Sequence, residues 1–223
     1  MSTPAAPRTR SSSAARAARA GEGSHRTWIF VGVGLVVVFA AILAVALATE
    51  ETSSTAAVAE VTVTGDPLPL FTEPTDDPAI GLPAPALSGT GIDDEPLEIT
   101  PGDGTAKVIT FFAHWCPVCQ TEVPLLVDLL DEGGLPDDVE LVAVSTGVDP
   151  ARGNYPPGAW FAREGWEEPT LVDDTQSPAG RAFGLSAYPY YVAVDAEGNV
   201  VQRSSGAISM EQVQQLAAAA AAG

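Results

Sequence analysis

Cysteines and basic residues are both scarce in this sequence, and each shortage excludes whole classes of protein. Two cysteines among 223 residues cannot form a four-cysteine zinc site or a scaffold of several disulfide bonds. Ten lysines and arginines stand against 29 aspartates and glutamates, which gives a formal net charge of -19. A chain this acidic is repelled by phosphate backbones, so nucleic acid is not expected among its partners. Whatever chemistry the two thiols perform, they perform it as a pair.

The charge changes sign along the chain. Residues 1–27 contain five arginines and one glutamate, whereas residues 49–223 contain 28 acidic and 5 basic residues. The segment 28–48 between them is uncharged, and as a helix it would span about 31 Å at about 1.5 Å per residue, which matches the hydrocarbon core of a bilayer. We therefore expect one transmembrane helix over 28–48 in the cell membrane, with the basic tail 1–27 in the cytoplasm and the rest of the chain outside it.

A cleaved signal peptide is the alternative to a retained anchor, because Ala46-Leu47-Ala48 has the small-x-small pattern of a cleavage site. The apolar run of 21 residues is longer than the roughly 7 to 15 residues of a signal peptide's apolar region, which favours the anchor. A buried helix of a soluble domain is disfavoured, since uninterrupted apolar segments of this length are rare in small soluble domains.

The region after the apolar run changes character. Residues 49–80 are rich in threonine, proline and acidic residues, and we expect them to form an extended tether. Within them, the alternation VTVT in Val58–Leu70 is also compatible with a strand that pairs with the domain. The folded unit is expected over 81–223, which is long enough for a single core.

Hydrophobic patterning in the folded unit predicts alternating strands and helices. Strands are expected at 97–99, 107–113, 139–145 and 171–172, with a hairpin of 190–195 and 199–203, and helices at 117–132, 159–164, 177–183 and from 209 onward. The strand, helix and strand between 107 and 145 form a βαβ unit with parallel strands. The sequence therefore predicts an α/β fold with a central sheet flanked by helices.

The two cysteines lie in Cys116-Pro117-Val118-Cys119, at the junction of a buried strand and the first turn of a helix. Unpaired N–H groups and the positive end of the helix dipole stabilise an anion there, which favours the thiolate of Cys116. With two residues between them, both sulfurs fall on the first turn, so Cys119 can reach Cys116 and resolve a mixed disulfide. The pattern predicts a redox-active pair in which Cys116 attacks and Cys119 resolves.

Other uses of the pair fit less well. A disulfide that closes a loop of about four residues restricts the unfolded chain by only about 2 kcal/mol, which makes it a weak structural staple. A closed zinc site needs four ligands, and only His114 lies nearby. Covalent c-type haem attachment requires a histidine directly after Cys119, where this chain has Gln120. We therefore expect neither a metal nor a diffusible cofactor.

In order and spacing, these residues resemble the thioredoxin superfamily, and within it the membrane-tethered, exported TlpA/ResA/DsbE-like branch, over about residues 81–215. The resemblance rests on GLPAPA at Gly81–Ala86, FAHWCPVCQTEVP at Phe112–Pro124, and Tyr188-Pro189 followed by YVAVDAEGNV at Tyr191–Val200. It implies a thioredoxin-like α/β sandwich, with a mixed central sheet flanked by helices and one transmembrane helix before it. It also implies a thiol:disulfide oxidoreductase that needs no diffusible cofactor, because the electrons travel as thiols.

The resemblance assigns substrate contacts near the cysteines. It implies that Pro189 is cis and lies beside the pair, where the backbone before it pairs with an extended substrate. Tyr188 stands where relatives often carry a small or β-branched residue. Trp115, directly before the nucleophile, is expected to pack beside it and offer substrate an apolar contact; a plain core tryptophan is the alternative.

The resemblance also points to a proton-handling carboxylate. Glu122 lies one helical turn after Cys119 and could accept its proton during resolution; a solvated helix acid is the alternative. Thr110 occupies the position at which cytosolic thioredoxins carry a buried acid, so Glu122 is the better candidate. Pro124 is expected to interrupt the helix and kink it.

Two features near the pair remain open at this stage. His114 could tune the thiolate by its charge, or be an exposed histidine without a role. The segment 147–168 contains Trp160 and Trp166, which either form a partner-recognition surface or belong to the core.

Exported cysteine-containing proteins and a membrane redox partner are the expected partners, and a membrane anchor raises the local concentration for both. The resemblance favours a reductase, for example in cytochrome c maturation, and a disulfide-forming oxidase of protein folding is the alternative. A thiol peroxidase would carry threonine where this chain has Ala113. A copper-binding module would have to combine both cysteines with His114, the only histidine of the exported part.

Overall fold

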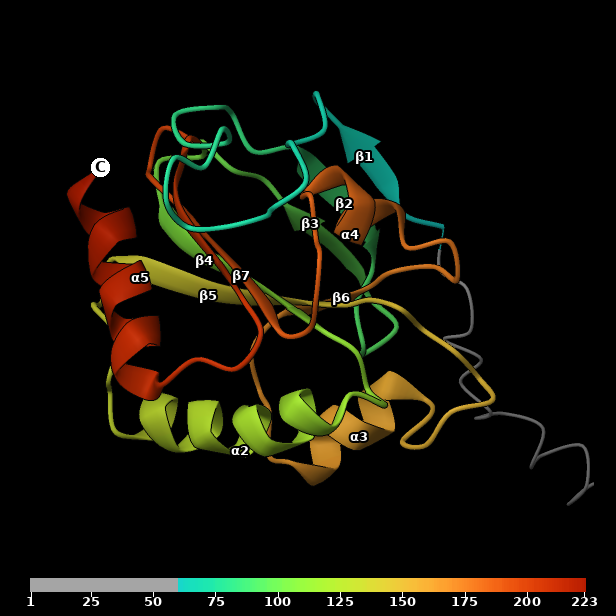
Figure 1. Cartoon of the computed structure of the whole chain (residues 1–223). Helices are drawn as coiled ribbons and strands as arrows, with labels where there is room; N and C mark the ends of the chain where they lie inside the picture. The colour runs from blue at the N-terminus through green and yellow to red at the C-terminus, as the bar shows by residue number, and fades with distance from the viewer. Residues whose placement is uncertain (1–59) are drawn as a thin grey trace, which may run out of the picture. The chain divides into compact units, whose positions relative to one another are not determined.

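The computed structural model describes residues 60–223, and they form two β-sheets and four helices (Figure 1). The elements are β1 Thr62–Thr64, β2 Ala86–Thr90, β3 Pro96–Ile99, β4 Ala106–Phe112, α2 Pro117–Asp131, β5 Val139–Ser145, α3 Pro157–Arg163, β6 Thr170–Val172, α4 Pro178–Ala182, β7 Tyr190–Val194, β8 Val200–Ser205 and α5 Met210–Ala222. The predicted basic tail, transmembrane helix and first part of the tether lie outside the described residues. Within 60–223, no helix is both long and apolar enough to cross a bilayer.

The central sheet has five strands in the order β6-β5-β4-β7-β8. β4 pairs in parallel with β5, and β5 with β6, while β7 and β8 add antiparallel pairs on the other side of β4. All seven residues of β4 are buried, as expected for a strand that is covered on both faces. The predicted mixed sheet, the parallel strands around α2 and the hairpin of β7 and β8 are therefore confirmed.

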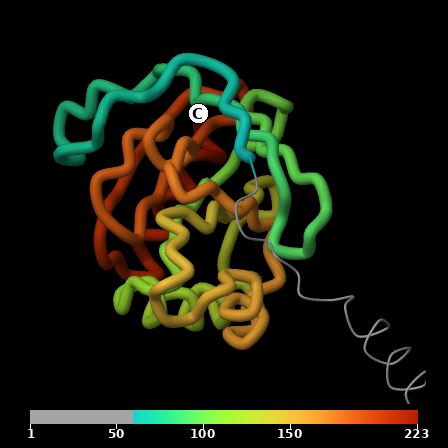
Figure 2. The backbone as a smooth tube through the Cα atoms, turned by 90° about the vertical axis from the view of Figure 1, so that its right-hand side faces the viewer, coloured from blue at the N-terminus to red at the C-terminus, as the bar shows by residue number. Residues whose placement is uncertain are grey.

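Different layers cover the two faces of this sheet. On one face, α2, α3 and α5 enclose a core that includes Cys119, Leu126, Trp160 and Tyr191. On the other face, the small sheet β1-β2-β3 and α4 enclose a second core. Figure 1 shows α2 and α3 below the central strands and β1, β2 and α4 above them. The rotated view separates the same layers, with the first described residues in blue-green running over the side opposite α2 (Figure 2).

The side chains of β7 alternate between the two cores. Tyr190 belongs to the core under the small sheet and Tyr191 to the core under α2, because successive strand residues point to opposite faces. Both tyrosines are 0% exposed. Two adjacent tyrosines of β7 therefore lie in two different cores.

The structure differs from the predicted tether over its last residues. β1 pairs antiparallel with β2, and Leu68 and Phe71 are buried against the domain. Asp77 forms an ion pair with Arg203 of β8, and both side chains are almost completely buried. Scattered apolar residues and one paired acid therefore anchor a segment whose average composition is that of a linker. The folded unit begins before residue 81.

The segment 147–168 contributes both of its tryptophans to the core. It contains α3, and Trp160 and Trp166 are 0% and 4% exposed. Trp166 packs edge-on against Phe112 of β4, with ring centroids 5.8 Å apart. These two tryptophans are therefore core residues and leave little surface for partner recognition.

Candidate active site

Cys116 is the N-cap residue of α2, and Pro117 occupies the first helical position, where its missing N–H and fixed φ suit a helix start. No side chain caps this helix and its first turn contains no acidic residue. The unpaired N–H groups and the positive end of the dipole therefore face the Cys116 sulfur without a competing carboxylate. Both cysteines are free thiols; Cys116 is 7% exposed and Cys119 is 0% exposed.

A backbone carbonyl from the segment just before β7 lies beside the Cys116 sulfur. The Tyr188–Pro189 peptide bond is cis, as the resemblance implied. The Cys116 Sγ lies 4.0 Å from the carbonyl oxygen of Tyr188. The structure thus brings the cysteine pair and the Tyr188-Pro189 turn together.

Trp115 and Tyr188 form an aromatic wall next to Cys116. Their rings meet edge to face with centroids 5.6 Å apart, and the Trp115 Nε1–H donates to the Gly147 carbonyl at 2.7 Å. The Arg152 guanidinium lies 4.3 Å from the centre of the Trp115 ring. Gly147 has φ +61°, and a Cβ there would lie 2.5 Å from the Tyr188 hydroxyl, so only glycine fits. Because both aromatic rings remain partly exposed, Trp115 is not a plain core residue.

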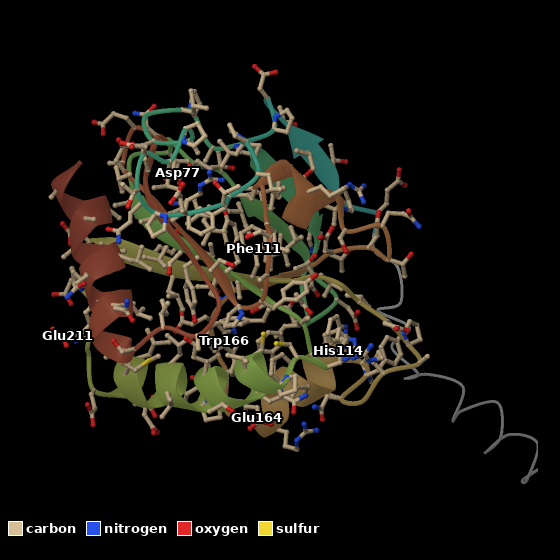
Figure 3. The ribbon with its side chains drawn as sticks, in the orientation of Figure 1. Asp77, Phe111, His114, Glu164, Trp166 and Glu211 are labelled. Carbon is tan, nitrogen blue, oxygen red and sulfur yellow. The ribbon has the colours of Figure 1, made fainter. Side chains whose placement is uncertain are left out.

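His114 differs from both alternatives that the sequence left open. The side chain is 0% exposed, and burial lowers its pKa. Nδ1 lies 2.7 Å from the Gly153 carbonyl and Nε2 accepts from the Asp149 N–H at 3.2 Å. A carbonyl only accepts and an N–H only donates, so these partners select the neutral tautomer protonated at Nδ1. His114 therefore holds the loop that carries Arg152, and it is neither a charged modulator nor an exposed residue. Its position is labelled in Figure 3.

Glu122 lies on the buried face of α2 and not in solvent. It is 3% exposed, and its Oε1 accepts from the Ile208 N–H at 3.0 Å. Burial raises the pKa of this carboxyl, and the Ile208 N–H and the Tyr191 hydroxyl oppose that rise. The solvated-acid alternative is therefore wrong.

The resolving thiol and this carboxyl influence each other. Burial raises the pKa of the Cys119 thiol, and the nearby Cys116 and Glu122 add to that rise. A thiol that resists deprotonation needs a base close by before it can attack. Glu122 lies close enough to Cys119 to affect the pKa of its thiol. Thr110, by contrast, donates its hydroxyl to the Val142 carbonyl at 3.3 Å and adds no charge.

Comparison with known proteins gives a consistent result. Residues 64–219 match the Redoxin family. The chain belongs to the Redoxin family. It is 25% identical over 111 residues to the thiol:disulfide interchange protein HelX of Rhodobacter capsulatus, covering 50% of this chain and 58% of HelX. It is 26% identical over 139 residues to the thiol-disulfide oxidoreductase ResA of Bacillus thuringiensis, covering 60% of this chain and 75% of ResA.

A solved structure shows the same fold. The crystal structure of a putative thiol:disulfide interchange protein DsbE from Chlorobium tepidum superposes with a TM-score of 0.53 at 19% identity, covering 64% of this chain and 98% of that one. This redoxin domain therefore has the thioredoxin-like α/β fold, and its predicted resemblance to the TlpA/ResA/DsbE-like branch is confirmed. The matched part spans little more than half of HelX.

Tyr191 was not identified as a site residue from the sequence. It appeared there only as part of a strand pattern, yet its hydroxyl acts on the Glu122 carboxyl from β7. No local pattern marks this pair, because Glu122 is on a helix and Tyr191 on a strand far along the chain. Within residues 60–223, no group of three or more histidine, cysteine or acidic side chains is arranged to hold a metal ion.

Proposed function

We propose that this protein is a membrane-anchored thiol:disulfide oxidoreductase that exchanges disulfides with exported cysteine-containing proteins through Cys116 and Cys119. The observation that carries the proposal is the position of Cys116 at the uncapped start of α2, 4.0 Å from the Tyr188 carbonyl. Membership of the Redoxin family and the similarity to the thiol:disulfide interchange protein HelX and the thiol-disulfide oxidoreductase ResA support it.

The exchange follows from these positions. An extended substrate segment binds along the Tyr188 backbone and against the partly exposed Trp115 ring. The Cys116 thiolate attacks one sulfur of the substrate disulfide, the substrate S–S bond breaks, and a mixed disulfide forms. Cys119 then gives its proton to Glu122 and attacks the Cys116 sulfur, which releases the second substrate sulfur. The substrate is reduced, and the two cysteines are oxidised to a disulfide.

The direction that we propose is reduction of disulfides in exported proteins, for example during cytochrome c maturation, with oxidation of the thiols of folding proteins as the alternative. The same steps run in either direction, so the reduction potential of the cysteine pair determines whether the protein acts as a reductase or as an oxidase. Equilibration of the full chain with glutathione should give a value near that of thioredoxin, about -270 mV, for a reductase. A value near that of the folding oxidant DsbA, about -120 mV, would favour the oxidase.

The location that we propose is the outer side of the cell membrane, with residues 28–48 as the anchor and the N-terminal tail in the cytoplasm. The uncharged 21-residue run and the arginines before it support this topology. In intact cells, added protease should remove the redoxin domain, and alkaline carbonate should not extract the protein. A mature chain that begins after Ala48 would show a cleaved signal peptide.

The exchange activity is tested on the full chain in detergent with insulin as the disulfide substrate. The Cys116→Ala variant should lose turnover, because no thiol remains at the helix start. The Cys119→Ala variant should also stop turning over, but it should accumulate a mixed disulfide through Cys116. Full turnover by the Cys119→Ala variant would refute the resolving role. Absence of exchange by the wild-type protein would refute the proposed function.

A further inference from the structure

Four buried side-chain polar atoms among residues 60–223 have no hydrogen-bond partner: Glu122 Oε2, Ser145 Oγ, Trp160 Nε1 and the Tyr191 hydroxyl oxygen. Two of the four, Glu122 Oε2 and the Tyr191 hydroxyl oxygen, belong to side chains that lie close to Cys119 and are 3% and 0% exposed. Buried polar groups are almost always paired, because an unpaired group has lost its water without compensation. Two unpaired groups beside the resolving thiol therefore call for a functional explanation.

The two groups lie close enough to affect each other's pKa. Oε1 of Glu122 is held at 3.0 Å by the Ile208 N–H, from the loop before α5, which leaves Oε2 as the free oxygen. The Tyr191 hydroxyl is close enough to lower the pKa of Glu122. Burial raises the pKa of Tyr191, and the charges of Glu122 and Cys119 add to that rise. The nearby Cys116 and Glu122 in turn raise the pKa of the Cys119 thiol. Three groups thus lie near this carboxyl: Cys119 from α2, Tyr191 from β7 and the Ile208 N–H from the loop before α5.

We propose that Tyr191 is a positioning residue for Glu122, and that its hydroxyl donates a hydrogen bond to Oε2 when the carboxyl is ionised. The bond holds the carboxylate ready to take the proton of Cys119 in the resolving step. This proposal rests on the dithiol exchange proposed above and adds a residue to it.

The proton and electron changes balance as follows. In the mixed disulfide, Cys119 transfers its S–H proton to Glu122, and its sulfur attacks the Cys116 sulfur. The bond between Cys116 and the substrate sulfur breaks, and the electron pair leaves with the substrate. The leaving thiolate then takes up the proton from Glu122. Tyr191 keeps its own proton throughout, since burial raises the pKa of its hydroxyl.

The neighbouring tyrosine provides a matched control. Tyr190 is equally buried but faces the opposite core. Its hydroxyl donates to the Phe183 carbonyl at 2.9 Å and accepts from Arg203 Nη1 at 3.0 Å. Tyr190→Phe and Tyr191→Phe therefore remove the same hydroxyl group from adjacent residues of β7, and only the second removes it from the Glu122 side.

The test isolates the resolving step in the reduced full chain in detergent. Dithiobis-nitrobenzoate reacts first with Cys116 and releases one coloured thiolate, and attack by Cys119 releases the second. The second phase should accelerate with pH as Glu122 ionises. Tyr191→Phe should move this acceleration about one pH unit higher, which is about a tenfold lower rate on the rising limb. Its first phase should not change, and Tyr190→Phe should keep the wild-type midpoint.

Three results would overturn the proposal. They are an unshifted profile for Tyr191→Phe, an equal shift for Tyr190→Phe, and a further shift when Tyr191→Phe is added to Glu122→Gln. If the wild-type protein releases no second thiolate, dithiol exchange itself fails and the proposal falls with it. Two-phase release with an unshifted Tyr191→Phe profile removes only the positioning role. Infrared titration of the Glu122 carboxyl in Tyr191→Phe should show the same upward shift without any substrate.

Discussion

The two faces of the central sheet treat buried polar groups in opposite ways. Under the small sheet, Arg203 forms an ion pair with Asp77 and donates to the Tyr190 hydroxyl, so each group is paired. Under α2, the Tyr191 hydroxyl, one oxygen of Glu122 and the Trp160 indole N–H have no hydrogen-bond partner. In Figure 3, Asp77 lies on the opposite side of the sheet from Trp166, which belongs to the α2 side.

This difference separates groups that hold the fold from groups that we propose take part in the exchange. A fully paired buried network is rigid, and breaking it exposes an uncompensated charge. Groups left unpaired beside a reactive thiol can exchange a proton, and their proton affinities are shifted by burial. One strand, β7, supplies a tyrosine to each kind of environment.

The ion pair should give the largest effect on stability. Asp77→Asn leaves the Arg203 guanidinium buried without its counter-charge, which should lower the free energy of unfolding by about 3 to 5 kcal/mol. Chemical denaturation of the reduced protein measures this loss. Nitrobenzoate release below the unfolding transition should keep the wild-type pH midpoint, because the pair lies on the face away from Cys119.

A double variant shows whether Asp77→Asn destabilises the protein because it leaves the Arg203 charge unpaired or because it changes the packing. Arg203→Met together with Asp77→Asn removes both charges, and this double variant should be more stable than Asp77→Asn alone. Equal stability of the single and double variants would mean that the charge of Arg203 is not what destabilises Asp77→Asn.

Replacing the two tyrosines should give the next largest effects on stability, and the two replacements should differ from each other. Tyr190→Phe leaves Arg203 Nη1 and the Phe183 carbonyl each without one of their hydrogen bonds, and should cost about 1 to 3 kcal/mol of unfolding free energy. Tyr191→Phe removes a hydroxyl that makes no hydrogen bond in the structure, so at a pH at which Glu122 is protonated it should cost less unfolding free energy than Tyr190→Phe. Denaturation of both variants side by side checks the contrast. A larger loss for Tyr191→Phe would show that its hydroxyl is paired in solution.

Local patterns in the sequence were sufficient to predict the framework of the domain. The apolar run of β4 marked a strand buried on both faces, and Pro117 after Cys116 marked the helix start. The buried positions of α2, among them Cys119, Glu122 and Leu126, recur at helical spacing.

The long-range pairs could not be predicted in this way. Asp77 sits in a stretch with the composition of a linker, and only the fold brings Arg203 to it. His114 has the local context of an exposed residue, and its burial depends on the loop that closes over it. The placement of Pro189 beside the cysteines was predicted from the family resemblance, because no local pattern brings the two segments together.

The last and smallest contrast between the faces concerns pH and stability. Glu122 has a raised pKa because burial outweighs its hydrogen bonds, so the folded protein binds a proton that the unfolded chain has already lost. Stability from this group is therefore present below the unfolded pKa of Glu122 and falls as pH rises toward the folded value. Asp77 is the reverse, since Arg203 and the Ala79 N–H lower its pKa against the opposing effect of burial.

The two acids should therefore respond to pH with opposite signs. As pH rises from the unfolded to the folded pKa of Glu122, the wild-type protein should lose unfolding free energy relative to Glu122→Gln. As pH falls toward the folded pKa of Asp77, it should lose its advantage over Asp77→Asn. Denaturation curves of the three proteins across this range measure both slopes. Slopes of the same sign would mean that one of the carboxyls is not in the environment that the structure assigns to it, and the contrast between the two faces would then rest on the tyrosines alone.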